Sequence, residues 1–173
     1  RTMQCKFTSS DGQNEVGQGS AVTSSLMLCI TPSVHKHELA ALEVSNNGVD
    51  YTRNVVPFLF STPISVVSVQ PSILVAGLSS TVTISGGGFR PSDLANCALG
   101  RIRSRVEWVS SSQVLCSVRK DSPGNITIEV SNNGLDFTSS SLRIHYIDKT
   151  AVIARMNPRD GSIHGGTRVE FML

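Results

Sequence analysis

Short stretches of alternating apolar and polar residues recur along the chain and predict β-strands. Thr81–Ser85 alternates with period two and places Val82 and Ile84 on one face. Ile64–Val69 predicts an opening strand that ends before Pro71, because proline cannot donate to a β-ladder. Further strands are expected at Asn96–Leu99, Arg105–Val109, Gln113–Val118, Ile126–Ser131 and Leu142–Ile147. Turn residues separate these stretches and no helical stretch stands out, which favours an all-β antiparallel sandwich.

The chain also repeats itself. Glu43–Thr52 (EVSNNGVDYT) returns as Glu129–Thr138 (EVSNNGLDFT), an offset of 86 residues. A fixed period of this kind indicates repeated domains. The predicted organisation is a partial unit at 1–62 that lacks its opening strands, a complete unit at 63–149 and the opening strands of a third unit at 150–173. Each end is therefore expected to be completed by further polypeptide, either of the same parent chain or of a neighbouring molecule.

Four cysteines fall at matched places in the repeat. Cys5 and Cys29 are 24 residues apart, and Cys97 and Cys116 are 19 apart. These spacings suit one disulfide inside each unit, with reduced core cysteines as the alternative, and they do not have the CxxC spacing of a zinc site. Disulfides would place the chain in an oxidising compartment. The N-glycosylation sequon that starts at Asn125 points the same way.

Charge and hydropathy exclude several function classes. The net charge is only +2, so no general field for a polyanion is expected. No apolar run reaches the roughly 18 residues that a membrane helix needs. The sequence has no Gly-x-Ser-x-Gly elbow, no Gly-rich phosphate loop and no catalytic cysteine context. We therefore predict a protein that is not an enzyme and that uses no cofactor.

The repeated Asn-Asn-Gly motif predicts a turn in each unit. Asn-Gly is a strong hairpin signal, because both turn positions can take a positive φ at little cost. The predicted hairpin turns comprise Asn46, Asn47 and Gly48, and Asn132, Asn133 and Gly134. Asp50 and Asp136 could instead ligate calcium, but the turn already explains the asparagines and glycine.

Two other groups of residues are candidates for binding. Arg101, Arg103 and Arg105 alternate, so on one strand they would share a face and could bind sulfate, phosphate or an acidic glycan. A charged, solvated edge strand is the simpler interpretation. His35 and His37 could face one side as metal ligands, but no third ligand recurs nearby, so an ordinary loop and no metal site is expected.

An ordered set of motifs connects these features. The motifs are I-x4-P-x2-G-x3-G-G-T from Ile153 to Thr167, I-S-G-x-G-F from Ile84 to Phe89, Cys97, Q-V-L-C from Gln113 to Cys116, and V-S-N-N-G-x-D-F from Val130 to Phe137. This set resembles the IPT/TIG domain, an immunoglobulin-like fold shared by plexins and certain transcription factors. The departure is Val75–Ser80, which replaces the Gly-Gly-Thr pattern in the complete unit. The resemblance implies tandem immunoglobulin-like β-sandwiches.

The cysteine-paired form of this domain resembles extracellular members of the family, including receptor ectodomains, fibrocystin-like proteins and the stalk proteins of ciliary hairs. The resemblance therefore implies a structural or adhesive, non-catalytic segment at the cell surface, including the ciliary surface. Expected partners are neighbouring repeats, other subunits of a filament or a cell-surface ligand, with no nucleic acid and with a membrane contacted only through other parts of the parent. The alternative is a nucleic-acid-binding or dimerisation module of a transcription factor, which would need a larger basic patch and a reducing compartment.

Overall fold

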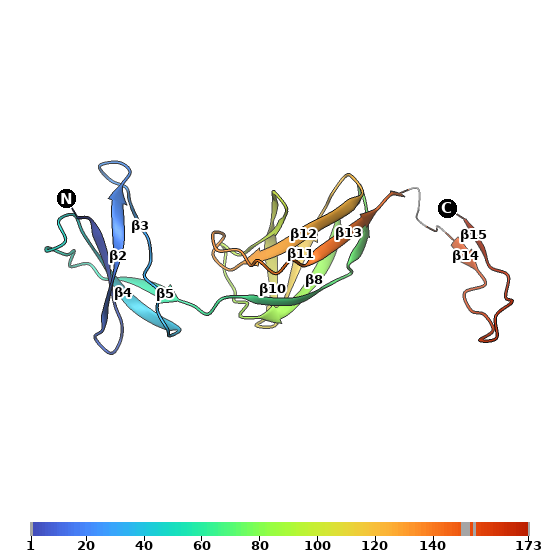
Figure 1. The fold of residues 1–173 in the computed structure, drawn as a ribbon, viewed down its shortest axis with the longest axis horizontal. Helices are drawn as coiled ribbons and strands as arrows, with labels where there is room; N and C mark the ends of the chain where they lie inside the picture. Colours follow the sequence, from blue (N-terminus) through green and yellow to red (C-terminus); the bar gives the residue numbers. More distant parts are fainter. Residues whose placement is uncertain (1, 150–152, 154, 173) are drawn as a thin grey trace. The chain divides into compact units, whose positions relative to one another are not determined.

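The computed structural model describes residues 2–149, 153 and 155–172. These residues contain β-strands, turns and loops but no α-helix. They fall into two compact units, Arg1–Thr62 and Pro63–Leu173 (Figure 1). Each unit is described by itself below. The all-β fold that the alternating pattern predicts is confirmed.

The first unit is one antiparallel set of five strands in the order β3-β2-β1-β4-β5. Its strands are β1 Gln4–Thr8, β2 Asn14–Ala21, β3 Met27–Cys29, β4 Glu38–Ser45 and β5 Val56–Phe60. Period-two alternation puts Cys5 and Phe7 on the inner face of β1, where both are buried. The rings of Phe7, Phe58 and Phe60 meet edge to face with centroids 5.0–5.2 Å apart. This aromatic cluster is the centre of a small core.

The second unit arranges eight strands in the order β6-β8-β11-β10-β9-β12-β13-β7. Their bounds are β6 Ser65–Gln70, β7 Ile73–Val75, β8 Ser80–Gly87, β9 Asn96–Leu99, β10 Ile102–Ser110, β11 Gln113–Val118, β12 Gly124–Ser131 and β13 Arg143–Ile147. All neighbours are antiparallel except β13 and β7, which run parallel. The unit is an immunoglobulin-like β-sandwich.

Strand β10 belongs to both layers of this sandwich. Its first half, Ile102–Arg105, pairs with β9, and its second half pairs with β11 from Val106 onward. The inward side chains of both layers, among them Val82, Ile128 and Ile144, are fully buried. The two halves of the fold therefore enclose one continuous hydrophobic core.

Sequence periodicity located the longer strands of this unit correctly and missed one short strand. The strands β9 and β11 have the predicted bounds, and β10 begins three residues earlier than predicted. The missed strand is β7, which has three residues and shows no alternation long enough to recognise. It pairs with β13 because Leu74 enters the core next to Tyr146. Tertiary packing therefore decides this element.

The last described residues form a separate two-stranded sheet of β14 Arg155–Asn157 and β15 Glu170–Met172. Asn157 is paired with Glu170, thirteen residues further on. In the second unit Gln70 is paired with Thr83, also thirteen residues further on. The hairpin thus has the register of β6 and β8, as the motif at Ile153–Thr167 suggests. Of the predicted third unit, residues 150–152, 154 and 173 lie outside the described residues.

Candidate functional site

The Asn-Asn-Gly motif folds in the same way in both units. In the first, the hydroxyl of Ser45 accepts from the backbone N–H of Gly48 at 2.9 Å. The Oδ1 of Asn47 accepts from the N–H groups of Val49 and Asp50, at 2.9 Å each. The Nδ2 of Asn47 donates to the carboxylate of Asp50 at 2.8 Å. The corresponding bonds made by Ser131 and Asn133 in the second unit are 2.7–3.0 Å long.

A threonine closes each of these loops. The backbone N–H of Thr52 donates to Val44 at 3.0 Å, while the Thr52 hydroxyl accepts from the Val44 N–H at 3.1 Å. Thr138 and Val130 repeat both bonds at 3.0 Å. The repeated decapeptide is therefore explained as a loop that is held by its own hydrogen bonds.

This geometry differs in one respect from the hairpin turn that the sequence predicts, in which both positions of Asn-Gly take a positive φ. Only the glycines, Gly48 and Gly134, have a positive φ, at 77° and 75°. The next strand begins at Val56 in the first unit and at Arg143 in the second, so each loop is long. The physical reason is that the asparagine side chain bonds the backbone two and three residues ahead and so holds a longer loop in place of a tight turn.

Asn132 makes contacts that its counterpart in the first unit does not make. Its Nδ2 donates to the carbonyl of Gly88 at 2.9 Å, and its Oδ1 accepts from the N–H of Arg90 at 3.2 Å. Asn132 thus anchors the loop to the turn that follows β8, where Phe89 is buried. Within the part of the chain that is described, Asn46 has no hydrogen-bond partner. The repeated motif alone gives no sign of this difference.

Both cysteine pairs are bonded within their units. Cys5 on β1 is joined to Cys29 on β3, with a Cα–Cα distance of 6.2 Å. Cys97 on β9 is joined to Cys116 on β11 at 6.3 Å. Each bond spans the strand that lies between the two, β2 in the first unit and β10 in the second. The two units therefore share one covalent plan.

The three alternating arginines do not form a free basic face. Arg101 lies in the turn before β10, and only Arg103 and Arg105 lie on the strand. Arg103 donates to the carbonyl of Gly134 at 3.0 Å and stacks on Phe137 at 4.6 Å. Arg105 pairs with Asp93 at 3.2 Å. Both guanidinium groups on the strand already have partners, which favours a structural role for them.

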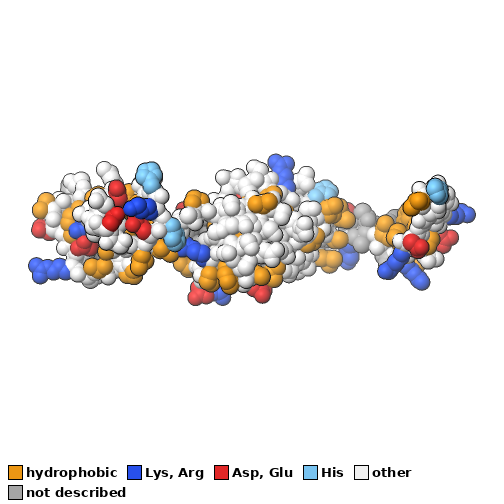
Figure 2. Space-filling model, turned by 90° about the horizontal axis from the view of Figure 1, so that it is seen from below, with side chains coloured by type: hydrophobic (Ala, Val, Ile, Leu, Met, Phe, Trp, Pro, Cys, Tyr) orange, Lys and Arg blue, Asp and Glu red, His pale blue; other side chains and the backbone are white. Residues whose placement is uncertain are grey.

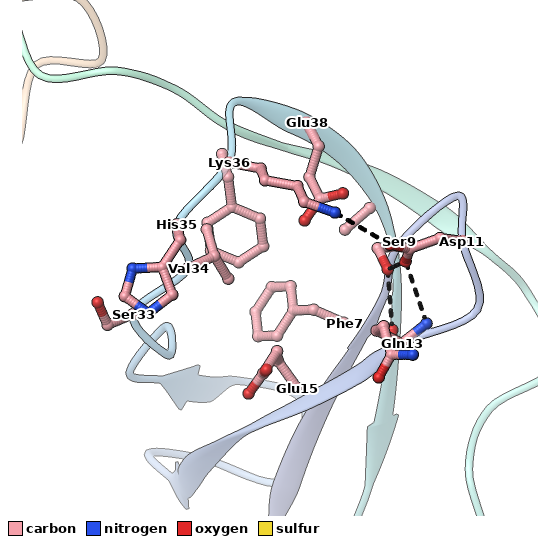
Figure 3. Close-up of a pocket in the computed structure, with 12 residues that line it drawn as sticks. Phe7, Ser9, Asp11, Gln13, Glu15, Ser33, Val34, His35, Lys36 and Glu38 are labelled. Carbon is pink, nitrogen blue, oxygen red and sulfur yellow. Dashed lines mark hydrogen bonds and ion pairs between the residues drawn. The ribbon is translucent and has the colours of Figure 1, made fainter.

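A pocket of about 220 Å³ opens on the first unit. Figure 3 shows the ring of Phe7 among its lining residues, with His35 on one side and Ser9 and Asp11 on the other. The hydrogen bond from Ser9 and the ion pair with Lys36, at 3.1 Å, lower the pKa of Asp11 to about 2. This carboxylate therefore favours the folded state above its ordinary pKa, and the effect is lost as the pH falls toward 2.

The second unit fills the corresponding place with its own chain. There the N–H of Ala76 donates to Ile147 at 2.9 Å, and the N–H of Gly77 donates to Lys120 at 2.9 Å. Ala76 and Gly77 thus continue the line of β7 beside β13. In the first unit the matching strand is β5, and it is the last strand of its sheet. The pocket is thus the space beside an unpaired edge of a sheet, and its shape indicates no particular small ligand.

The side chains that could serve as metal ligands by residue type are arranged as follows. His35 lines the pocket, whereas His37 is not among its lining residues. The carboxylates of Asp50 and Asp136 are held by asparagine side chains. Across the described residues, no group of three or more His, Cys, Asp or Glu side chains is arranged to hold a metal ion.

The sequon lies on the outer face of the second sandwich. Asn125 on β12 is exposed and is paired with His145 on β13. The Oδ1 of Asn125 lies 2.9 Å from the Nδ1 of His145 and, as an amide oxygen, accepts from its N–H. On the strand beyond, His145 is paired with Ile73, which is 59% exposed.

Uncharged groups dominate the visible surface of the second unit. Figure 2 shows that blue side chains are few and scattered over the face drawn there. No basic patch of the kind that tracks a nucleic-acid backbone is seen on that face. Among the described residues there is no helix long and apolar enough to cross a membrane.

The fold of the second unit places the chain in the class of immunoglobulin-like β-sandwich proteins. The family model of the IPT/TIG domain matches residues 63–146. The chain therefore carries an IPT/TIG domain over this unit. Its two disulfides fit the cysteine-paired, extracellular members of that family. IPT/TIG domains are non-catalytic interaction modules, which is the character that this match gives to residues 63–146.

Two curated relatives are similar to this chain over part of their length. Fibrocystin-L of Homo sapiens is 29% identical over 121 residues, which is 64% of this chain and 3% of that protein. Fibrocystin-L of Mus musculus is 29% identical over 91 residues, or 51% of this chain and 2% of that protein. The chain thus spans a very small share of these relatives.

One solved structure is a distant match. The plexin A4 full extracellular region aligns with 85% of this chain and 23% of that chain, at 13% identity and a TM-score of 0.43.

Proposed function

We propose that this chain is a non-catalytic segment of an extracellular protein built from repeated IPT/TIG units, in which the units supply length, stiffness and surface for neighbours. The observation that carries the proposal is one structural plan made twice. Each unit bonds two strands through cysteine across the strand between them, and each closes the same decapeptide loop with threonine. A repeated rigid module suits a spacer or an adhesive array.

The disulfides support the extracellular location. Such bonds persist in oxidising compartments and are rare in the cytosol. Each also gives a small unit stability that its core alone supplies poorly; closing a loop of this size contributes roughly 3 kcal/mol. The similarity to fibrocystin-L supports the cell surface, and we extend the proposal to the ciliary surface on the earlier resemblance to fibrocystin-like and ciliary-hair proteins.

The same features argue against a module that binds nucleic acid. Such a module needs free cations along one face, and here Arg103 and Arg105 are held by their own unit. The partners that we propose are other protein domains, namely adjacent repeats, subunits of a filament or a cell-surface ligand. None of these requires a cofactor.

Counting thiols tests the proposed location and fold together. The full chain is secreted from eukaryotic cells behind a cleavable signal, denatured without reductant and titrated with a thiol reagent. We expect no free thiol before reduction and all four cysteines after it. Free thiols in folded, secreted protein would contradict the proposal and favour the reduced, intracellular alternative.

A further inference from the structure

We propose that Asn125 carries an N-linked glycan that covers the outer face of β13 and β7 and blocks the edge of the sheet there. The inference rests on the proposed extracellular location, because the glycosylation machinery works in the secretory pathway. The sequon Asn125-Ile126-Thr127 lies on β12 (Figure 1). The structure shows where the side chain of Asn125 points and which residues lie beside it.

The asparagine is held in a way that leaves its reactive nitrogen free. Its Oδ1 is occupied by the Nδ1–H of His145 at 2.9 Å. Its Nδ2, the atom that carries an N-glycan, has no partner within the described part of the chain. The neighbours Ile144 and Tyr146 point into the core, so Asn125 and His145 face solvent together. The folded domain can hold a glycan here without moving its backbone.

The covalent step needs a sugar donor from the secretory pathway. The Nδ2 of Asn125 attacks the anomeric carbon of the first sugar of a polyprenyl-diphosphate-linked oligosaccharide. An N–C bond forms, the bond from that carbon to the diphosphate oxygen breaks, and the polyprenyl diphosphate leaves. Nδ2 loses one proton, and no electrons are transferred to an external acceptor. Transfer normally precedes folding, so the structure describes how the product is accommodated.

The shielding follows from a row of residues across three strands. Asn125 is paired with His145, and His145 is paired with Ile73 on β7. Neighbouring strands are about 4.8 Å apart, so Ile73 lies about 10 Å from the glycosylated strand. β7 is the last strand of its sheet, and Ile73 is 59% exposed. An uncovered edge with an exposed isoleucine invites pairing with another chain, and a bulky hydrophilic glycan prevents it.

The first unit provides a comparison within the same chain. The positions that match Asn125 and His145 are Leu39 and Leu59, a cross-strand pair that is 60% and 42% exposed. Leu39-Ala40-Ala41 is not a sequon. Under the proposal, the outer face of the second unit is sugar-covered while that of the first is apolar and open to a protein neighbour.

Peptide mapping of the secreted full chain tests the modification. We expect a glycan on Asn125 in the wild type and in Thr127→Ser, and none in Asn125→Gln or Thr127→Ala. A double variant, Leu39→Asn with Ala41→Thr, transplants the sequon to the first unit and should gain a second glycan. Unmodified Asn125 in secreted protein whose thiols are all bonded would overturn the inference and leave the proposed function intact. Free thiols would instead count against the proposed function.

Shielding is tested on protein that has already folded. A glycosidase that releases the whole glycan leaves aspartate at position 125, so failure of a variant to fold is not at issue. We expect self-association to rise after this treatment, as measured by analytical ultracentrifugation, and to fall again in treated Ile73→Thr. Equal self-association before and after treatment would overturn the shielding role.

Discussion

At the scale of single residues, one matched position of the two cores differs by a hydroxyl. Tyr146 on β13 occupies the place that Phe60 occupies on β5. The Tyr146 hydroxyl is buried and finds no hydrogen-bond partner among the described residues, and burial raises its pKa. Tyr51, in contrast, donates its hydroxyl to Gln4 at 2.8 Å. The two tyrosines of the chain thus have opposite environments.

Replacing each tyrosine by phenylalanine should have opposite effects on stability. Tyr146→Phe removes an unpaired buried hydroxyl and is expected to raise the free energy of unfolding of the second unit by about 1 kcal/mol. Tyr51→Phe removes a hydroxyl that is hydrogen-bonded to Gln4. This substitution should lower the free energy of unfolding of the first unit by a similar amount.

Urea unfolding followed by the fluorescence of Trp108, the one tryptophan, reports the second unit. Hydrogen exchange of β1 and β4 amides reports the first. A loss of stability in Tyr146→Phe would show that the hydroxyl is satisfied in solution.

At the scale of elements, alternation and repetition in the sequence carry most of the fold. The alternation at Val82 and Ile84 correctly predicted the buried face of β8, because successive side chains of a strand point to opposite faces. The strand β7 could not be found, because its place depends on Leu74 meeting residues more than sixty positions away. The prediction that three arginines share one face required all three to lie on one strand. Arg101 instead lies in the turn before β10.

The sequence likewise predicted some features of the candidate site and not others. The four cysteines and the sequon follow from residue types and spacing alone. The role of Asn132 does not, because its identical neighbour in the motif, Asn133, bonds only within the loop. The two asparagines differ because Asn132 bonds to the turn at Gly88, which lies 44 residues earlier in the chain. Sequence repetition therefore overstates how alike the two loops are.

Alanine substitution should reveal this difference between the loops. Asn132→Ala breaks bonds to Gly88 and Arg90 and is expected to lower the free energy of unfolding of the second unit by about 2 kcal/mol. Asn46→Ala is the matched control, and the first unit should change by less than about 0.5 kcal/mol. Equal losses from the two substitutions would show that both asparagines act only through the motif they share.

At the scale of the whole molecule, the disulfides decide how the chain responds to being pulled. Cys97 and Cys116 are bonded across β10, so the residues between them cannot be drawn out even after the sandwich unravels. Nineteen extended residues span about 65 Å, of which the bonded cysteines already span 6.3 Å. Reduction should therefore release about 60 Å of extra length.

Single-molecule stretching of the full chain measures this length directly. We expect the rupture of the second unit to lengthen the tether by about 60 Å more in reductant than without it. An equal step in both conditions would mean that the bond does not form in the folded protein.

A chain of such units would extend under tension only up to a length that its disulfides set. Tension can separate the layers of a sandwich, yet the cross-strand bond keeps part of every unit folded back on itself. A surface protein built in this way would yield under shear, dissipate energy as its units open, and still hold its two ends within a fixed reach of each other.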